Sequence, residues 1–490
     1  MSETRRPDPK VVGDCVHCGF CLPACPTYSL WGEEMDSPRG RIHLIDQVIN
    51  GAPVDDVLTG HLDACLGCLA CVPACPSGVR YDLLIGAARA QVEEEHRRPL
   101  RERLLRSLIF AIFPHPARLR LMRGPLYLYR RLALDRLMRR IAPRLALLAR
   151  LAPEPRSLPD SGIPSRGNAQ PESLGTARQA GSLGPHHDAG PRRAQHDAPH
   201  IPAHDDAPHD SAHVSAQHDT DRVSEPADAP QRPGTARPHR PRGRTAIPER
   251  TPATGTTRAR VGMLTGCVQR EFFPEVNAAT VRVLAAEGVE VIVPKRQGCC
   301  GALSWHSGRD REARGFAQDV VTAFRDVDVV VANAAGCGSA LKEYAEILGE
   351  APPFRVVDVA ELLHELGPVA ERHPLPLSVA YHDACHLANA QGIRTAPRAL
   401  LRQIPGLTLH EIPDAGMCCG SAGVYNVLNP APAADLGDRK ADAIAATGAD
   451  LLVTANPGCL LQIADAFRRR GGTPPRLAHT IEVLDRAISG

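Results

Sequence analysis

The spacing of the cysteines constrains this chain more than any other feature. Eight of its 16 cysteines lie within residues 11–95, in two runs with the pattern C-x2-C-x2-C-x3-C followed by proline. The runs are Cys15, Cys18, Cys21, Cys25 and then Cys65, Cys68, Cys71, Cys75. Three thiols this close together lie on one tight loop, where their sulfurs can face a common point. The proline after the fourth thiol predicts a break in the local helix, which turns that thiol away from the other three.

This pattern is typical of bacterial ferredoxins, which bind [4Fe–4S] clusters, and the fourth cysteine of each run then ligates the other cluster. Zinc sites use paired C-x2-C motifs rather than a triple run. We therefore predict a two-cluster domain over residues 1–95 that carries electrons and performs no catalysis. The interval 26–64 is longer than in a minimal ferredoxin and has a helical pattern, which predicts a helix-rich variant. The predicted ligand sets are Cys15, Cys18, Cys21 and Cys75 for one cluster, and Cys65, Cys68, Cys71 and Cys25 for the other.

The other eight cysteines belong to an internal duplication in the second half of the chain. Short β-branched runs (VGMLTG, VEVIVP and VDVVVANAAG, then LSVAYHD, LTLHEIP and DLLVTAN) alternate with helical patterns, which predicts α/β units. A similar predicted helix ends each copy, at 356–366 and at 478–488. We therefore predict two homologous domains, over 259–370 and 371–490. The paired cysteines are Cys267 with Cys385, Cys299-Cys300 with Cys418-Cys419, and Cys337 with Cys459, at offsets of 118, 119 and 122 positions.

Each copy places four thiols near strand ends, where α/β proteins usually bind ligands. Adjacent cysteines make a strained disulfide, so each set is a candidate site for an iron–sulfur cluster or a zinc ion, with a purely structural group of thiols as the alternative. The candidate metal ligands are Cys267, Cys299, Cys300, Cys337, Cys385, Cys418, Cys419 and Cys459. Nearby polar residues that could ligate a metal or hydrogen-bond its ligands are His306, Asn333, His382, Asp383, His386 and Asn456.

Two stretches separate the cysteine-rich parts. Residues 96–151 are rich in Leu and Arg with an apolar period of three to four, which predicts helices divided by prolines at 114, 116, 125 and 143. Such helices can contact anionic lipid or pack on the cysteine-rich domains or a partner subunit, and we favour packing. Residues 152–258 are dominated by Pro, His, Asp and Ala. They hold too few large apolar side chains to offset the entropy of ordering, which predicts a disordered linker.

Composition narrows the class of protein. The 57 Lys and Arg nearly balance the 55 Asp and Glu, giving a net charge of +2, which argues against a nucleic-acid-binding protein. No apolar run reaches the roughly 18–20 residues of a transmembrane helix, and the N-terminal residues lack the apolar core of a secretory signal. We therefore expect a cytoplasmic protein, in which 16 cysteines indicate metal or redox chemistry rather than disulfides.

The duplicated Cys-Cys-Gly motifs resemble the CCG cysteine-rich domain of heterodisulfide reductase subunits and their relatives. In that family the last motif is C-x-x-C, whereas this chain has Ala340 and Gln462 where the final cysteines would stand. The absence of these two cysteines argues against a role for this chain in reducing disulfides. The resemblance implies an α+β multidomain fold: a helix-rich two-cluster ferredoxin domain followed by a duplicated α/β cysteine-rich (CCG) domain.

Residues 1–130 and 259–490 together resemble the iron–sulfur subunit of bacterial glycolate oxidase. The resemblance rests on the two cysteine runs, the segment SPRGRI (Ser37 to Ile42) between them, and the motifs GCVQ, GCCGAL, AGCGSALKEY, CCGSAGVYN and VTANPGC. It implies a complex in which a partner FAD subunit oxidises glycolate to glyoxylate. This chain, which has no GxGxxG fingerprint and no P-loop, would pass the electrons towards a quinone or another carrier, at the inner face of the cytoplasmic membrane if it associates peripherally.

Three alternatives remain open at this stage. The chain could be the iron–sulfur subunit for lactate or glycerol-3-phosphate oxidation, because the cysteines do not distinguish these substrates. It could be a thiol–disulfide enzyme like the heterodisulfide reductases, with the CCG site as its catalyst. It could also be a metal-binding or scaffold protein without redox chemistry.

Overall fold

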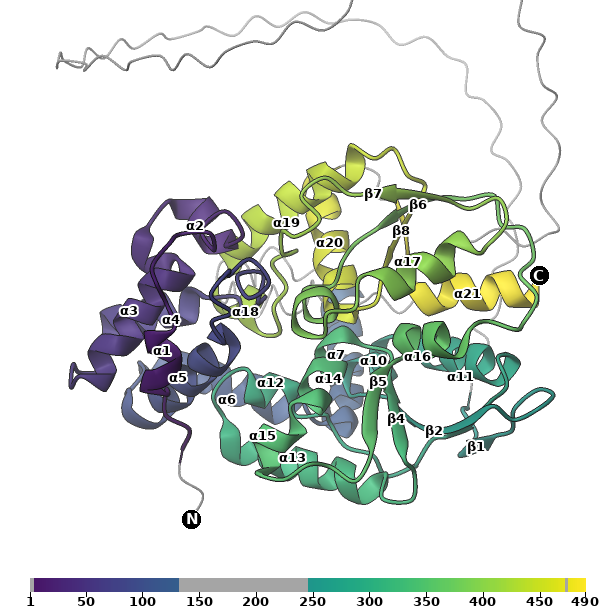
Figure 1. Ribbon diagram of the computed structural model, residues 1–490, viewed down its shortest axis with the longest axis horizontal. Helices are drawn as coiled ribbons and strands as arrows, with labels where there is room; N and C mark the ends of the chain where they lie inside the picture. Colours follow the sequence, from purple (N-terminus) through teal and green to yellow (C-terminus); the bar gives the residue numbers. More distant parts are fainter. Residues whose placement is uncertain (1–3, 132–245, 472–474) are drawn as a thin grey trace, which may run out of the picture. The chain divides into compact units, whose positions relative to one another are not determined.

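The computed structural model describes residues 4–131, 246–471 and 475–490 (Figure 1). These residues belong to one unit of the chain. The predicted linker, 152–258, lies outside the described residues as far as position 245. Its last part does not follow the prediction, because β1 (Arg250–Thr251) pairs antiparallel with a strand of the first cysteine-rich copy.

The N-terminal part is helical, as predicted, and its helices surround the two cysteine loops. They are α1 (Pro9–Gly13), α2 (Pro26–Trp31), the 3-10 helix η1 (Glu34–Asp36), α3 (Pro38–Ile49), α4 (Asp56–Ala64) and α5 (Tyr81–Glu95). Their common core includes Ile42, Ile45, Leu58, Leu62, Tyr81 and Leu84.

The proline after the first cysteine run has a different role from the one predicted. Pro26 begins helix α2 rather than ending one, and Cys25 is the N-cap residue. Proline is favoured at the first helical position because its fixed φ angle suits the helix and its missing N–H is not needed there. Cys25 therefore lies at the start of this helix, directly after the loop that carries the other three thiols of its run.

The first cysteine-rich copy is built on a five-stranded sheet with the order β1-β3-β2-β4-β5, in which all pairs except β1–β3 are parallel. Its further strands are β2 (Ala259–Leu264), β3 (Val289–Ile292), β4 (Val329–Ala332) and β5 (Arg355–Asp358). Its helices are α10 (Val268–Phe272), α11 (Pro274–Ala286), α12 (Ala302–Trp305), α13 (Asp310–Ala323), α14 (Ala335–Lys342), α15 (Tyr344–Leu348) and α16 (Val359–Leu366). Alternate residues of β2 and β4 face two different hydrophobic clusters, so both faces of the sheet are covered.

The second copy repeats this plan with four parallel strands in the order β7-β6-β8-β9 (Figure 1). The strands are β6 (Ser378–Tyr381), β7 (Thr408–Glu411), β8 (Leu451–Thr454) and β9 (Arg476–His479). The helices are the π-helix η2 (His386–Ala390), α17 (Thr395–Arg402), α18 (Tyr425–Leu428), α19 (Pro430–Ala445), α20 (Pro457–Arg469) and α21 (Thr480–Ser489).

The strand runs read from the sequence form β2, β3, β4, β6, β7 and β8, whereas β5 and β9 were missed. These two strands occupy the beginning of the segments predicted as terminal helices, 356–366 and 478–488. In both copies the helix starts directly after the strand, at a capping box that pairs the N-cap residue with a glutamate three positions later. A four-residue strand that runs straight into a cap leaves no turn residues to mark the boundary.

The Leu/Arg-rich stretch forms α6 (Leu100–Ile112) and α7 (Pro116–Arg131), and its remainder lies outside the described residues. Helix α7 continues through Pro125, so this proline does not divide the segment as predicted. Ile109 and Phe110 of α6 pack on the second copy beside Val424. Helix α7 contacts α10, where Arg120 pairs with the buried Glu271 at 2.8 Å. In the parts of the chain that the structure describes, no helix is long and apolar enough to cross a membrane.

Candidate iron–sulfur and metal centres

The two N-terminal cysteine loops have the same unusual backbone. Each carries a left-handed residue two positions after its first cysteine, His17 or Gly67, and another two positions further, Gly19 or Leu69. Non-glycine residues rarely adopt positive φ because Cβ then crowds the following carbonyl. The repeated conformation makes each loop curl around a centre, which brings its first three thiols to the same side.

The two loops form two separate hollows, and the wall of each contains thiols from both cysteine runs. The first hollow is lined by Cys15, Cys18, Cys21 and Cys75, and also by Cys71. The second is lined by Cys25, Cys65, Cys68 and Cys71. In both cases three thiols of one loop stand with the fourth cysteine of the other run.

These hollows differ in exposure. Cys18 in the first is exposed, whereas Cys25, Cys65, Cys68 and Cys71 of the second are all buried. Burial raises the pKa of Cys68 and of Cys71 well above the usual value, because a desolvated thiolate without a cation is unfavourable. The four buried thiols together fit a cationic inorganic group that stabilises their deprotonated forms.

The segment SPRGRI lies beside both hollows, and the structure shows what it does. Ser37 caps α3 by accepting a hydrogen bond from the backbone N–H of Gly40 at 3.0 Å. Gly40 lies directly against η1, where a Cβ atom at this position would stand 2.0 Å from the carbonyl oxygen of Glu34. The glycine is therefore needed for close packing of two backbones.

Arg41 is 1% exposed and lies in the wall of the second hollow. Its guanidinium donates to the backbone oxygen of His61 at 2.7 Å, to the hydroxyl of Thr27 at 3.1 Å and to the carboxylate of Asp36 at 3.1 Å. Burial raises the pKa of Cys65, but the positive charges of Arg41 and Arg89 outweigh it and leave that pKa below the usual value. The sequence singled out this segment but gave no role to the arginine, because its partners come from α4, η1 and α2.

In the first cysteine-rich copy, the thiols follow three neighbouring parallel strands. Cys267 comes after β2, the Cys299–Cys300 pair after β3, and Cys337 lies in α14 after β4. Cys267 and Cys299 have their sulfurs 3.6 Å apart, and the side chains of Cys300 and Cys337 also interact. Because β2 stands between β3 and β4, its carboxyl end is the point where the chain switches direction in the sheet, which is the usual ligand site of such folds.

The second copy has the same arrangement after β6, β7 and β8. Its thiols interact in the same succession, from Cys385 through Cys418 and Cys419 to Cys459. Gly420, with φ of +83°, allows the Cys-Cys pair to approach α19, since a Cβ here would stand 2.5 Å from the carbonyl oxygen of Ala433.

The polar residues named from the sequence fall into three groups. Asn333 and Asp383 are held by other partners: Asn333 donates to Asn277 and Thr280, and Asp383 pairs with Arg398 at 2.7 Å. Asn456 donates to the sulfur of Cys459 at 3.4 Å, as a hydrogen-bonding neighbour of a ligand would.

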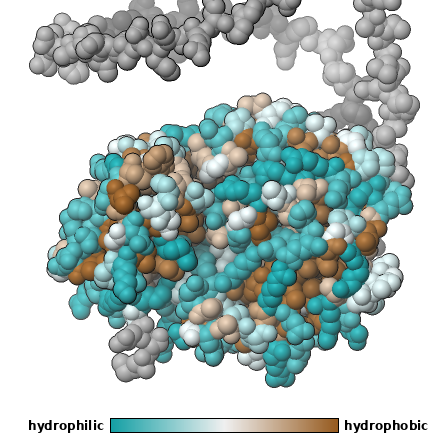
Figure 2. Space-filling view, in the orientation of Figure 1, coloured by the Kyte–Doolittle hydropathy of each residue, from teal (hydrophilic) through white to brown (hydrophobic). Residues whose placement is uncertain are grey.

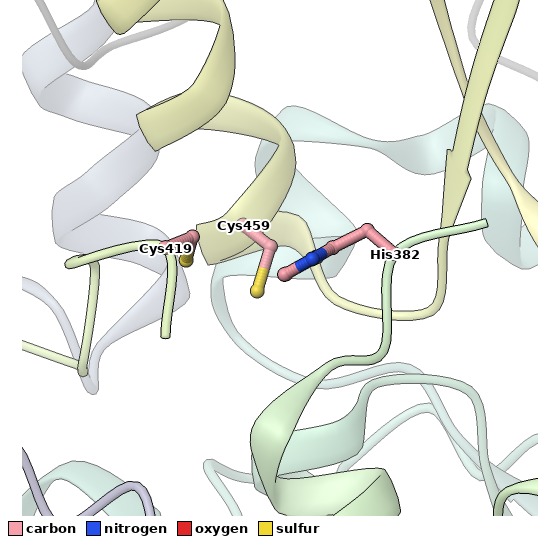
Figure 3. A group of neighbouring side chains, drawn as sticks. All are labelled: His382, Cys419 and Cys459. Atoms are coloured by element: carbon pink, nitrogen blue, oxygen red, sulfur yellow. The ribbon is translucent and has the colours of Figure 1, made fainter. Parts of the chain in front are cut away.

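The three histidines lie closer to the thiols. The ring of His306 faces that of His386 with centroids 5.0 Å apart, and Nδ1 of His386 is 3.4 Å from the sulfur of Cys385. His382 lies with Cys419 and Cys459, and burial lowers its pKa to about 3, which keeps the imidazole neutral. Figure 3 shows its ring beside the two thiols.

A cavity of about 570 Å³ joins the two cysteine-rich sites. All eight thiols of the two copies contribute to its wall, together with Cys65 of the N-terminal part and the side chains of His306 and Glu343. Glu343 is fixed by hydrogen bonds from Trp305 and Ser339, which sequence reasoning did not identify. Ser339 and Glu343 stand in the motif AGCGSALKEY, but the motif gave them no role, because they meet the other residues of the cavity only in the folded chain.

The N-terminal part reaches this region through its second loop. Cys68, Leu66 and Ala70 pack in one cluster with Cys418 and Tyr425 of the second copy. The amide of Asn389 donates to the backbone oxygen of Cys68 at 3.0 Å. The buried hollow and the second cysteine-rich site therefore lie next to each other, whereas the hollow with Cys18 opens to the surface.

Two hollows lined by thiols of both cysteine runs and two further four-thiol sites define an iron–sulfur protein of the dicluster type with a duplicated cysteine-rich domain. Sequence profiles agree with this class: a 4Fe-4S dicluster domain matches residues 11–79, and a cysteine-rich domain matches 261–342 and 379–464. A third profile, the linker region of glycolate oxidase iron-sulfur subunits, matches residues 101–152. The expected fold class is confirmed.

Full-length relatives identify the family. The chain is 32% identical to the "Probable glycolate oxidase iron-sulfur subunit" of Bacillus subtilis (strain 168), over 96% of this chain and 93% of that protein. It is 30% identical to the "Glycolate oxidase iron-sulfur subunit" of Escherichia coli (strain K12), over 97% and 93% of the two chains. The chain therefore belongs to the family of glycolate oxidase iron–sulfur subunits, as the resemblance predicted.

A shorter relative shares only part of the chain. "Lactate utilization protein A" of Halalkalibacterium halodurans is 30% identical over 46% of this chain and 96% of its own length. The region that the two proteins share therefore occurs in relatives whose names refer to different substrates, glycolate and lactate. This chain is an iron–sulfur electron-transfer subunit of a glycolate oxidase-type complex.

Proposed function

We propose that this chain receives electrons from a partner FAD subunit that oxidises glycolate to glyoxylate, and that it delivers them towards a quinone or another carrier. The observation that carries the proposal is the pair of thiol-lined hollows, one open to the surface and one in contact with the second cysteine-rich copy. When bound, two [4Fe–4S] clusters would supply one-electron carriers whose potentials depend on burial and nearby charge.

The chain's own residues then hold and tune these carriers. We assign Cys15, Cys18, Cys21 and Cys75 to the first cluster and Cys25, Cys65, Cys68 and Cys71 to the second, in line with the two linings. Arg41 adds a buried positive charge to the wall of the second set, which favours the reduced state there, whereas Arg39 in the wall of the first set is partly exposed to water and so acts more weakly. Electrons would thus move from the exposed set to the buried one.

The surface around Cys18 is the side on which we place the flavoprotein. Val16 and Phe20 flank this thiol, and each is 67% exposed. Figure 2 shows hydrophobic patches among hydrophilic ones on the face that carries the N-terminal helices. An apolar pair beside an exposed ligand suits a partner that must bring its flavin close to the first hollow while excluding water.

The exposed leucines of α6 offer a second contact. Leu100, Leu104 and Leu108 recur every four residues on one face of the helix and stay exposed, although the opposite face packs on the second copy. We propose that this stripe contacts either the flavoprotein or, peripherally, the inner face of the cytoplasmic membrane, where a quinone would be reached.

The experiment is an anaerobic co-purification of the tagged chain with its flavoprotein from the native host, followed by dye reduction with glycolate, lactate and glycerol-3-phosphate in separate assays. We expect reduction with glycolate. Preference for lactate would keep the electron-transfer role and change the substrate, as the shorter relative suggests. If none of the three substrates reduced the dye in a sample that contains the flavoprotein, the proposal would be contradicted.

A variant tests the ligand assignment in the same sample. Cys68→Ser should lose or convert the buried cluster and abolish electron delivery to the dye, while Cys337→Ser, in the first cysteine-rich copy, should leave both ferredoxin-type signals in place. Iron content and the low-temperature EPR spectrum of the reduced protein report the two clusters separately. Two intact cubanes in the Cys68→Ser protein would refute the assignment.

A further inference from the structure

The second cysteine-rich copy contains a donor set that the first copy lacks. One ring nitrogen of His382 and the sulfurs of Cys419 and Cys459 all lie within 4.8 Å of one another, and all three residues are buried. Figure 3 shows the imidazole from the end of β6 meeting two thiols that come from other segments of the copy. Three convergent donors of mixed nitrogen and sulfur type are what a zinc-class ion binds.

His382 has no partner within the protein for one of its ring nitrogens. The residue is 2% exposed, and Nδ1 makes no hydrogen bond in the part of the chain that the structure describes. Buried polar atoms are nearly always paired, so an unpartnered nitrogen next to two thiols points to a ligand. The charged neighbours do not serve this purpose: Asp383 is held by Arg398, and the ammonium of Lys440 donates to the backbone oxygen of Asp414.

The spacing of the donors fits a single ion rather than a cluster. With zinc–sulfur and zinc–nitrogen bonds of about 2.3 and 2.0–2.1 Å, tetrahedral ligands stand roughly 3.5–3.8 Å apart. Three donors within 4.8 Å need only a small adjustment to reach this geometry. Ligands bound to different irons of a cubane stand farther apart, because the separation of the metals is added.

The first copy cannot form the same set. The offset of 118 positions that pairs Cys267 with Cys385 places Leu264 where the second copy has His382. Leu264 is buried in the apolar cluster of its sheet. The two copies therefore have the same thiols but different chemistry, four sulfurs in the first and four sulfurs plus a nitrogen in the second.

We propose that His382, Cys419 and Cys459 ligate one zinc-class divalent ion in the second copy. The fourth position of a tetrahedral shell falls to a thiol outside this group of three, that of Cys418, which is adjacent to Cys419 in the chain. Asn456, which donates to the sulfur of Cys459, orients one ligand. The first copy is left as an all-thiol site, suited to an iron–sulfur cluster. This inference does not depend on the substrate or on the partner subunit.

The test measures zinc in the full-length chain, purified anaerobically from cells grown with zinc. We expect one zinc per chain, and X-ray absorption at the zinc edge should give three sulfurs and one imidazole nitrogen. His382→Leu, which copies the first site, should weaken zinc retention against a chelator at least tenfold. His386→Leu, four residues further along the chain, is the matched control and should retain zinc like the wild type.

His382→Cys guards against a variant that merely misfolds. If position 382 is a ligand, this variant should keep the ion and change the shell to four sulfurs. A wild-type chain without zinc, a shell of sulfur alone, or equal zinc retention in His382→Leu would each overturn the proposal. None of these readouts uses glycolate or a dye, so a failed electron-transfer assay would leave the result interpretable.

Discussion

Replacing Arg41 by glutamine separates the stability of the N-terminal part from the tuning of its buried hollow. The guanidinium is 1% exposed and has partners on three elements, the His61 carbonyl, the Thr27 hydroxyl and Asp36. Removing one member of a buried ion pair costs about 3–5 kcal/mol. Asp36 keeps a contact of 3.0 Å with His61 Nδ1, so we expect the lower end, about 3 kcal/mol.

The same substitution removes a positive charge from the wall of the second hollow. At a separation of about 7 Å and an effective dielectric constant of about 20, one unit charge changes the energy of another by about 2 kcal/mol. For a one-electron couple this is on the order of 100 mV. Because a cation favours the reduced, more negative state, Arg41→Gln should lower the midpoint potential of the buried set, with a much smaller change in the exposed set.

The assay is an EPR-monitored redox titration together with chemical denaturation followed by loss of the visible iron–sulfur absorption. Arg41→Lys keeps the positive charge but loses the planar guanidinium and its several hydrogen bonds. This variant should therefore be less stable than the wild type but keep most of the midpoint potential of the buried cluster. Arg103→Gln, at an exposed position of α6, is the neutral control. Unchanged potentials in a folded Arg41→Gln protein, or a larger shift in the exposed set, would refute the reasoning.

Two further predictions concern packing, and a third concerns the exposed leucines of α6. Gly40→Ala should destabilise the N-terminal part by several kcal/mol, because its Cβ would overlap η1, whereas Gly60→Ala, with open space in α4, should be tolerated; thermal loss of the iron–sulfur absorption compares them. Gly308 has φ of +77° and a Cβ there would stand 2.4 Å from the backbone of Arg89, so Gly308→Ala should loosen α5 from the first copy and raise amide hydrogen exchange at that contact. Gly315→Ala, in α13 with nothing within 4 Å, is its control, and equal exchange in the two would contradict the expectation. Leu104→Glu should abolish binding to anionic vesicles if the α6 stripe contacts lipid, and should instead weaken flavoprotein co-purification if it contacts the partner; no change in either would remove the stripe from the account.

The sequence predicted those features that depend on local spacing. The two cysteine runs, the duplication and six of the strands follow from residue intervals and from β-branched runs between turn signals. The features that it missed depend on contacts between distant segments. Gly40 and Arg41 acquire their roles from η1, α2 and α4, and the proximity of Cys68 to Cys418 arises only when two separate parts of the chain pack together.

Two boundaries failed for a local reason. Strands β5 and β9 are four residues long and pass directly into capped helices, so their apolar residues extend the helical pattern by one turn. Pro26 was expected to end a helix, whereas proline is equally suited to begin one. The division of the eight thiols between two clusters stays a prediction that the linings of the two hollows support.

The most direct measurement of the central claim is rapid-freeze EPR after mixing the oxidised complex with glycolate under anaerobic conditions. We expect flavin reduction followed by signals of reduced iron–sulfur clusters in this chain, and loss of the signal of the buried cluster in Cys68→Ser. Flavin that is reduced by glycolate while the iron of this chain stays oxidised would contradict it.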